Sequence, residues 1–549
     1  MSTATLVRSV FWMVALAIAF LAPLLIESVF RRAERAFAAF AARRLLCCLG
    51  LGLLVLVGRL AMLPLREIPK PYVSDEFCYL LQADTFSSMR LANPPHPLAE
   101  FFENPFLLQH PTYNAKFPPG QGMLLAAGKL LTGNPWFGVW LSCGLLAATL
   151  CWALQGWLPS SWALFGSVLT LPLCLSSYWM DSYWGGSVAA IGGGLVVGAL
   201  ARLVRQKQAS YAAILAFGSV LLAYTRPFEG LLVLLPVCLY LLRSRLPMQT
   251  WMAGAAILTV GMGWLGYYNY RVTGNPARVP YVEYDSQYPS TTHFNILPLP
   301  PPVKFRTQNL RWKDAWERRN WDLARGPELL SLRSRRWVRI VGAFLGSAVL
   351  ICPLLLFWRQ LLPNRRLRPL WWALLFSFAG SWIEVIYVEH YAAPVLPVIL
   401  VLVVQSFRHL RLWTFQGNAT GLALTRTLLA ASMLLWIGQE GIHLSRRQPV
   451  GETPDNSHKS EIEAALEQKG PAHVVLVRYK SAFQIERPLD IHSDWNYNRA
   501  DIDSASVIWA HDLGPDENRR LLQYFKGRAF WLFQPDDFPG HLEPYQPGQ

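Results

Sequence analysis

Two adjacent acids, Asp75 and Glu76, are the first residues in the chain that could do chemistry. A carboxylate fixed in place can take a proton from a hydroxyl group as a general base, or it can bind a divalent metal. The alternative is a structural role, because acids stabilise the first turn of a helix and residues 79–86 can form an amphipathic helix lying on a membrane.

Three cations and a tyrosine are candidates for binding an anion such as phosphate. Lys116 and Tyr113 precede a rigid Pro-Pro-Gly turn at 118–120, while Arg226 lies in a short turn and Arg271 near the start of a basic loop. A planar guanidinium is well suited to phosphate. Each also has a bland alternative, which is a snorkelling lysine, an ion pair with a neighbouring acid or attraction to anionic headgroups.

Aromatic rings flank an acid at Trp179, Asp181 and Trp184. Tyrosine and tryptophan at a membrane boundary form an aromatic belt, which accounts for the rings without a function. Rings beside a carboxylate also suit a carbohydrate, because the rings pack on C–H faces while the acid accepts from hydroxyls. The three residues are therefore candidates for contact with a sugar or an acceptor.

A metal is possible but is not specified by the sequence. Glu389 and His390, followed by Tyr391, could form a pair of ligands. Glu76 and His110 are the other possible ligands. The sequence leaves the metal open.

Composition decides which elements must position these residues. The chain has 549 residues, of which 53% are hydrophobic and only 15% are charged. Soluble proteins carry about 25% charged residues, and disordered chains lack such apolar content. The sequence therefore predicts an α-helical polytopic membrane protein.

About twelve apolar runs approach the roughly 20 residues that a membrane-spanning helix needs. They lie at 10–30, 45–64, 134–156, 161–179, 186–204, 209–223, 229–242, 250–268, 337–358, 369–388, 391–407 and 422–441.

The net charge of +15 is unevenly placed. Arginines after alternate spans mark one face as cytoplasmic, so no nucleic acid is needed to explain the charge. The opposite face carries the loops 65–133 and 269–336 and the tail, and the candidate residues gather there. The loop 269–336 holds 12 bases and 6 acids, whereas the tail from Ser445 holds 16 acids and 12 bases.

The tail 445–549 is expected to form a small soluble α/β domain after a polar linker at 445–460. Strands are predicted at 473–478, 505–510 and 528–534, with a helix at 515–525 that begins with Pro515 and acids. The eight cysteines lie mostly inside spans, without disulfide or zinc spacing.

Several short motifs together resemble those of the polytopic GT-C glycosyltransferases. Asp75-Glu76, with Tyr79 and Ala83, is similar to a D-E-x-x-Y-x-x-x-A pattern in the first large external loop. Phe117 and the turn at 118–120 resemble a Y-P-P-G element. Within that class, the motifs are similar to those of the bacterial branch related to protein O-mannosyltransferases and to the aminoarabinose transferase of lipid A. The segment from His390 to Pro394, which precedes a late span, also resembles a motif of this class.

That resemblance implies an enzyme of the bacterial inner membrane, with residues 1–444 as the catalytic domain and the active site outside the cytoplasm. It implies transfer of a hexose or pentose from a polyprenyl-phosphate sugar to a lipid, glycan or protein acceptor, with inversion. Asp75 would be the general base and Glu76 a second base or metal ligand. Donor-binding residues would be Lys116, Tyr113, Arg226, Arg271, His390 and Tyr391. No cofactor is certain, and a divalent metal is possible.

Two other classes fit part of the pattern. A transporter or flippase of a lipid-linked or anionic substrate would place charges in broken helices at mid-membrane. Most charges here lie instead at the ends of spans. A non-catalytic envelope assembly protein would need no general base.

Overall fold

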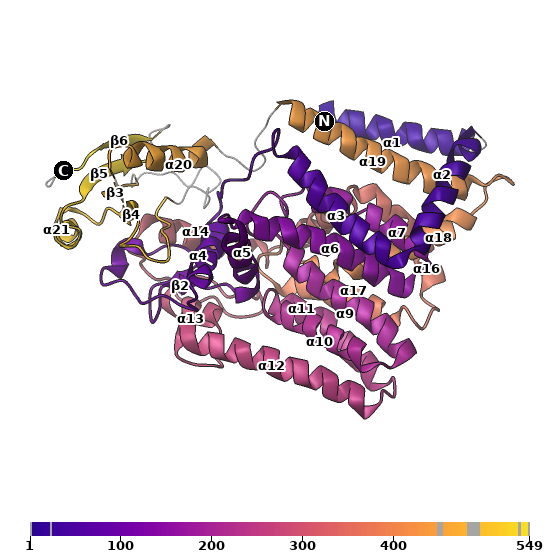
Figure 1. Cartoon of the computed structure of the whole chain (residues 1–549), viewed down its shortest axis with the longest axis horizontal. Coiled ribbons are helices and arrows are strands. Elements are labelled where there is room, and N and C mark those ends of the chain that lie inside the picture. Colours follow the sequence, from indigo (N-terminus) through magenta and orange to yellow (C-terminus); the bar gives the residue numbers. More distant parts are fainter. Residues whose placement is uncertain are drawn as a thin grey trace.

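The computed structural model describes residues 3–21, 25–446, 454–470, 472–479, 495–535 and 540–546. A bundle of apolar helices makes up most of the molecule, and a small C-terminal unit lies beyond one end of it (Figure 1). Shorter helices, among them α4 (Ser74–Ser87) and α5 (Pro119–Thr132), lie between the bundle and that unit.

Five helices are long and apolar enough to cross a membrane, judged by length and composition over the described residues. They are α3 (Arg44–Met62), α6 (Trp136–Trp157), α9 (Ser187–Gln206), α18 (Leu396–Leu412) with the 3-10 turn Ala393–Val395 before it, and α19 (Thr420–Arg446). A sixth crossing is formed if α15 (Leu329–Leu345) and the segment Ala348–Leu361 count as one span, bent by 96°.

Each of the twelve predicted spans overlaps a helix or a helix pair, but several are shorter or broken. The remaining helices in these regions are α1 (Thr3–Leu21), α2 (Leu25–Ala42), α7 (Ser160–Val168), α8 (Leu171–Ser176), α10 (Ala209–Ala223), α11 (Pro227–Leu242), α12 (Met248–Thr273), η2 (Ala348–Ile351), α16 (Cys352–Leu361) and α17 (Arg368–Ile383). The predicted span 161–179 is broken between α7 and α8, just before Pro172, which lies at the start of α8. The bend within 337–358 follows Gly346, whose φ of +74° ends α15.

Glycines let these helices approach closely. A Cβ on Gly193 of α9 would lie 2.2 Å from the carbonyl oxygen of Pro394, so no other residue fits there without a shift. Gly193 therefore serves the close packing of α9 against the 3-10 turn before α18.

The two predicted external loops contain structure of their own. The first holds α4, η1 (Ala99–Phe102), the short strands β1 (Leu107–Leu108) and β2 (Asn114–Ala115), and α5. The second holds α13 (Pro280–Gln287) and α14 (Gln308–Leu323). The helix expected at 79–86 is confirmed as part of α4, whereas α14 was not predicted.

The described part of the C-terminal unit forms a four-stranded sheet with two helices. Its elements are α20 (Pro454–Glu467), β3 (His473–Val477), β4 (Val507–His511), α21 (Pro515–Tyr524), β5 (Ala529–Gln534) and β6 (His541–Pro544). The strand order is β4-β3-β5-β6, with β6 alone antiparallel. The three predicted strands and the helix are confirmed. The linker prediction was wrong from Pro454 onward, where α20 begins, and 447–453 lie outside the described residues.

Candidate active site

Asp75 lies in the first turn of α4, where its side chain is half-buried. Burial raises the pKa of Asp75 to about 6, and the positive charges of Lys116 and Arg226 oppose that rise. Among the described residues, no side chain forms a hydrogen bond or an ion pair with this carboxylate. A carboxyl group of raised pKa and without a partner is characteristic of functional sites.

Glu76 has the opposite surroundings. Its Oε2 accepts from the backbone N–H groups of Tyr72 at 2.9 Å and Val73 at 3.1 Å, and its Oε1 accepts from Tyr183 at 2.8 Å. Burial raises the pKa of Glu76 to about 7, and these three donors oppose the rise. Glu76 thus fixes the start of α4 to the segment around Tyr183, and so positions Asp75.

Lys116 brings an ammonium group to the same region. Its side chain is only 5% exposed, and its Nζ lies 4.3 Å from the ring centroid of Phe106 and 4.8 Å from that of Tyr284. Burial lowers the pKa of Lys116, while the charge of Asp285 opposes this. No carboxylate of the described residues lies within ion-pair distance, so aromatic faces are its main neighbours.

A close backbone contact joins the loop that holds Lys116 to the turn that holds Arg226. The N–H of Gly120 donates to the carbonyl of Tyr224 at 2.8 Å, and a Cβ on Gly120 would lie 2.8 Å from that same oxygen. The glycine of the predicted Pro-Pro-Gly turn is therefore required for the turn to reach the end of α10, two residues before Arg226.

Arg226 stands immediately before α11, and its guanidinium carbon lies 4.0 Å from the ring centroid of Tyr391. Its distance to the carboxylate of Glu229 is 3.9 Å, which is too long for a bidentate pair. Arg226 therefore keeps donors available, and its charge acts on both Asp75 and Tyr79.

His390 and Tyr391 join the cluster from the segment before α18. The Nδ1 of His390 lies 3.0 Å from the hydroxyl of Tyr178, and its ring packs edge-on against Trp184 with the ring centroids 4.7 Å apart. Burial lowers the pKa of His390 well below its usual range, so the imidazole is neutral. Trp184 thus remains placed beside the predicted donor-binding residues.

Helix α14 adds two residues that sequence reasoning missed. The ammonium of Lys313 donates to Oε2 of Glu317 at 2.8 Å. It also lies 5.2 Å from the ring centroid of Tyr284, which Lys116 contacts as well. The charge of Glu317 acts on Asp75 and on Lys116. The i, i+4 spacing of a lysine and an acid was the available signal, but it reads equally as a surface pair.

Three predicted residues lie apart from this cluster. The hydroxyl of Tyr113 donates to the carbonyl of Asn498 in the C-terminal unit, at 3.4 Å. Arg271 is exposed on the last turn of α12 and donates to the hydroxyl of Tyr267 at 3.1 Å. His110 is exposed. Tyr113 and Arg271 were predicted to bind the donor phosphate and His110 to be a possible metal ligand, whereas the fold turns each of them elsewhere.

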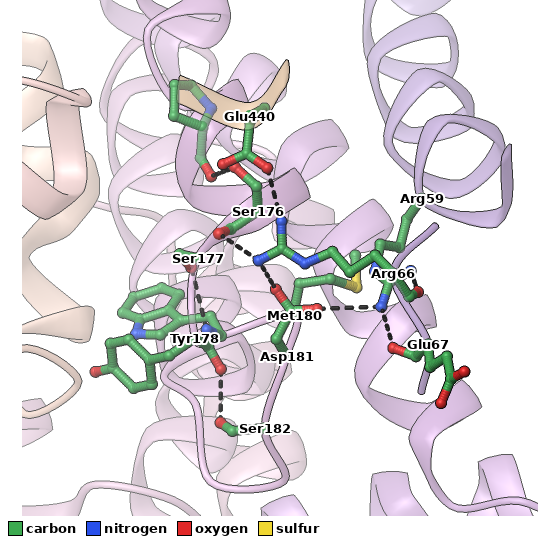
Figure 2. Close-up of polar contacts among 12 residues, drawn as sticks. Arg59, Arg66, Glu67, Ser176, Ser177, Tyr178, Met180, Asp181, Ser182 and Glu440 are labelled. Carbon is green, nitrogen blue, oxygen red and sulfur yellow. Dashed lines mark hydrogen bonds and ion pairs between the residues drawn. The ribbon is translucent and has the colours of Figure 1, made fainter. Parts of the chain in front are cut away.

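Asp181 is held in an ion-pair cluster (Figure 2). Its Oδ1 lies 3.1 Å from Nη2 of Arg59 and its Oδ2 lies 2.6 Å from Nη2 of Arg66. Arg66 also pairs with Glu440 at 2.7 Å. Trp179 is 1% exposed and packs edge-on against Phe344. These positions tie the segment 177–186 to α3 and α19, so we no longer expect Asp181 or Trp179 to contact a sugar.

The candidate metal ligands do not gather. Within the described ranges, no group of three or more His, Cys, Asp or Glu side chains could hold a metal ion. Glu76 is engaged by backbone donors, and Glu389 lies 3.9 Å from Nε of Arg339.

A cavity of about 430 Å³ lies between α4 and the C-terminal unit. Its lining includes Phe77, Asp84, Lys459 and Trp509, and none of the predicted site residues. Phe77 and Asp84 lie on a different face of α4 from Asp75, so this cavity is separate from the cluster around Asp75.

Comparison with known proteins shows similarity in fold. No protein-family model and no curated protein sequence matches the chain. The crystal structure of ArnT from Cupriavidus metallidurans bound to undecaprenyl phosphate is similar over 90% of this chain and 93% of that one, with a TM-score of 0.54 and 13% identity. Its apo structure is similar over 89% and 93%, with a TM-score of 0.53 and 13% identity. The chain has the GT-C fold.

This result confirms the fold class predicted from the sequence, a polytopic helical membrane protein with a small C-terminal unit. The cluster around Asp75 is assembled by this fold rather than by local sequence. Lys116 precedes α5, Arg226 precedes α11 and Tyr391 precedes α18. Glu76, which positions Asp75, and its donor Tyr183 are separated by 107 positions in the chain.

Proposed function

We propose that this protein is a membrane glycosyltransferase that moves a sugar from a polyprenyl-phosphate donor to a lipid, glycan or protein acceptor. The single observation that carries the proposal is the unpaired carboxylate of Asp75 in the field of Lys116 and Arg226. A base that is free to accept a proton, beside cations that keep N–H donors available for phosphate, provides what the transfer needs.

The proposed reaction is a direct displacement. Asp75 takes the proton of an acceptor hydroxyl, and the resulting oxygen forms a bond to the anomeric carbon of the sugar. The bond between that carbon and the phosphate oxygen breaks, and its electron pair stays on the leaving polyprenyl phosphate. Lys116 and Arg226 stabilise the charge that develops there. Attack opposite to the leaving group inverts the anomeric centre.

Similarity to ArnT supports the choice of donor. ArnT has been crystallised with undecaprenyl phosphate, and the phosphate-binding groups proposed here lie in loops of the same fold. His390, Tyr391 and Trp184 would contact the donor or the sugar. Tyr113 and Arg271 are left out of the proposed site because the fold directs them elsewhere.

The proposed placement is the inner membrane of a bacterium, with the site and the C-terminal unit outside the cytoplasm. The arginine pattern of the loops supports this orientation. We propose residues 1–444 as the catalytic membrane domain and 445–549 as a soluble domain. A hexose or a pentose fits the proposal equally.

Release of polyprenyl phosphate from purified full-length protein tests the function. Wild-type protein, supplied with polyprenyl-phosphate sugars and an envelope extract as acceptor, is expected to release the lipid phosphate. Asp75→Asn is expected to slow release by about 10²–10⁴-fold, whereas Glu76→Gln acts through the position of α4 and is expected to lose less. Asp322→Asn removes an exposed acid of α14 and serves as the matched control.

Two outcomes would contradict the proposal. Equal release by wild type and Asp75→Asn would remove Asp75 as the base. Movement of the lipid-linked substrate across proteoliposomes without cleavage would identify a transporter instead.

A further inference from the structure

Two lysines from different loops share one pair of aromatic rings. The Nζ of Lys116 lies 4.3 Å from the ring centroid of Phe106 and 4.8 Å from that of Tyr284. The Nζ of Lys313 lies 5.7 Å and 5.2 Å from the same two centroids. Both lysines are at least nine-tenths buried, so little water screens their positive charges.

The two ammonium groups differ in how they are neutralised. Lys313 has one carboxylate partner, Glu317, one turn further along α14, whereas Lys116 has no carboxylate of the described residues within ion-pair distance. An ammonium carries three donors, so the bond to Glu317 leaves Lys313 with two more. Lys116 is thus a cation without a carboxylate partner. The charge of Lys313 is balanced by Glu317, but two of its N–H donors stay available.

The proposed reaction changes the charge of the phosphate. The donor is a phosphodiester with one negative charge. When the sugar–oxygen bond breaks, the product is a phosphomonoester, which carries about two negative charges above its second pKa of about 6. Lys116 and Arg226 suit the charge of the donor, and a further cation is needed only once the product forms.

We propose that Lys313 is a further phosphate cation of this site, beside Lys116 and Arg226, and makes the site bind the doubly charged monoester in preference to the singly charged diester. This inference rests on the proposed function and deepens it. Lys313 keeps its bond to Glu317 and donates a further N–H to the oxygen that leaves the sugar. Glu317 sets the strength of that preference, because it offsets the charge of Lys313 while the donor is bound.

The C-terminal unit fixes where Lys313 lies. Near the start of α14, Nδ2 of Asn309 lies 3.4 Å from Nε2 of His511 in β4. Trp312 packs edge-on against Tyr479, with ring centroids 5.0 Å apart. The residue next in the chain is Lys313, so these contacts place its side chain beside the rings.

Binding of two lipids that differ only in phosphate charge tests the inference without any turnover. The probes are undecaprenyl phosphate and its methyl diester, measured at pH 8 with full-length protein in nanodiscs. Wild type is expected to bind the monoester about tenfold more tightly than the diester. Lys313→Met is expected to reduce the ratio to about two, and Lys313→Arg to preserve it. Glu317→Gln is expected to raise the ratio.

Arg319→Met removes an exposed cation of the same helix and is expected to leave the ratio unchanged. A ratio in Lys313→Met equal to that of wild type would overturn the inference. So would an equal loss of both affinities, because that marks a structural role. Failure of the proposed function gives a different result, namely no release of polyprenyl phosphate by wild type.

Discussion

Two clusters in this molecule each bring two cations to one acid, and they have opposite character. Around Asp181, two arginines approach the carboxylate at 2.6 and 3.1 Å, so its charge is fully matched. Around Asp75, Lys116 and Arg226 act on the carboxylate only at a distance, and no described side chain bonds to it. Both clusters join segments far apart in the chain, and both are largely shielded from water.

The two clusters differ in whether each charged side chain has an oppositely charged partner in contact. The Asp181 cluster satisfies its charges internally and can therefore hold α3, the segment 177–186 and α19 together. The Asp75 cluster keeps an acid and two cations apart, which is unfavourable unless a ligand supplies the missing charges. We therefore interpret the separated charges around Asp75 as a functional site and the paired charges around Asp181 as a structural contact.

Removal of the matched acid should give the largest effect on stability. Asp181→Asn leaves Arg59 and Arg66 without their shared partner in a buried position. We expect the free energy of unfolding to fall by about 3–5 kcal/mol, measured by thermal or denaturant unfolding in detergent. An unchanged unfolding midpoint would contradict the structural role.

Removal of an unmatched cation should affect turnover instead. Lys116→Met is expected to slow release of polyprenyl phosphate by about 10²–10³-fold, as loss of a group that stabilises developing charge does. Its unfolding midpoint should equal or exceed that of wild type, because a buried ammonium without a carboxylate is costly. A destabilised protein with normal turnover per folded molecule would reverse this interpretation.

The proton on Asp75 should set the acid limb of the pH profile. Burial raises the pKa of Asp75 to about 6, so the carboxylate is protonated, and inactive as a base, below that pH. The rate of release should therefore fall about tenfold per pH unit below about pH 6 and level off above about pH 7. Glu76→Gln should retain this fall in rate at acid pH. If the fall disappears in that variant, the titrating group is Glu76 and not Asp75.

The smallest effects should come from residues that the fold separates from the site. Tyr113→Phe removes a long hydrogen bond to Asn498, and Arg271→Met removes an exposed cation on α12. Each is expected to change the rate of release by less than about twofold, measured in the same assay. A tenfold loss in either would return that residue to the site.

The sequence predicted the parts that depend on local pattern. Hydrophobic runs located the helices of the bundle, and short apolar runs between turn residues located β3, β4 and β5. The motifs also picked out Asp75, Lys116, Arg226 and Tyr391, which the fold gathers from separate loops.

Pairings over long distances were not predictable from local pattern. The aromatic neighbours of Asp181 suggested a sugar site, whereas its partner Arg59 lies 122 positions away. The i, i+4 spacing of Lys313 and Glu317 is equally typical of a surface pair, and only the packing of α14 against Tyr284 shows that Lys313 is buried. Sequence spacing describes contacts within one helix or loop, whereas the charged side chains of the candidate site come from several helices and loops.

The comparison of Asp75→Asn with Asp181→Asn, each measured for release of polyprenyl phosphate per folded molecule and for thermal unfolding, tests the central claim most directly. Asp75→Asn should lose about 10²–10⁴-fold in release with an unfolding temperature within about 2 °C of wild type. Asp181→Asn should unfold at a lower temperature while its folded fraction keeps more activity. Wild-type release by Asp75→Asn would contradict the account.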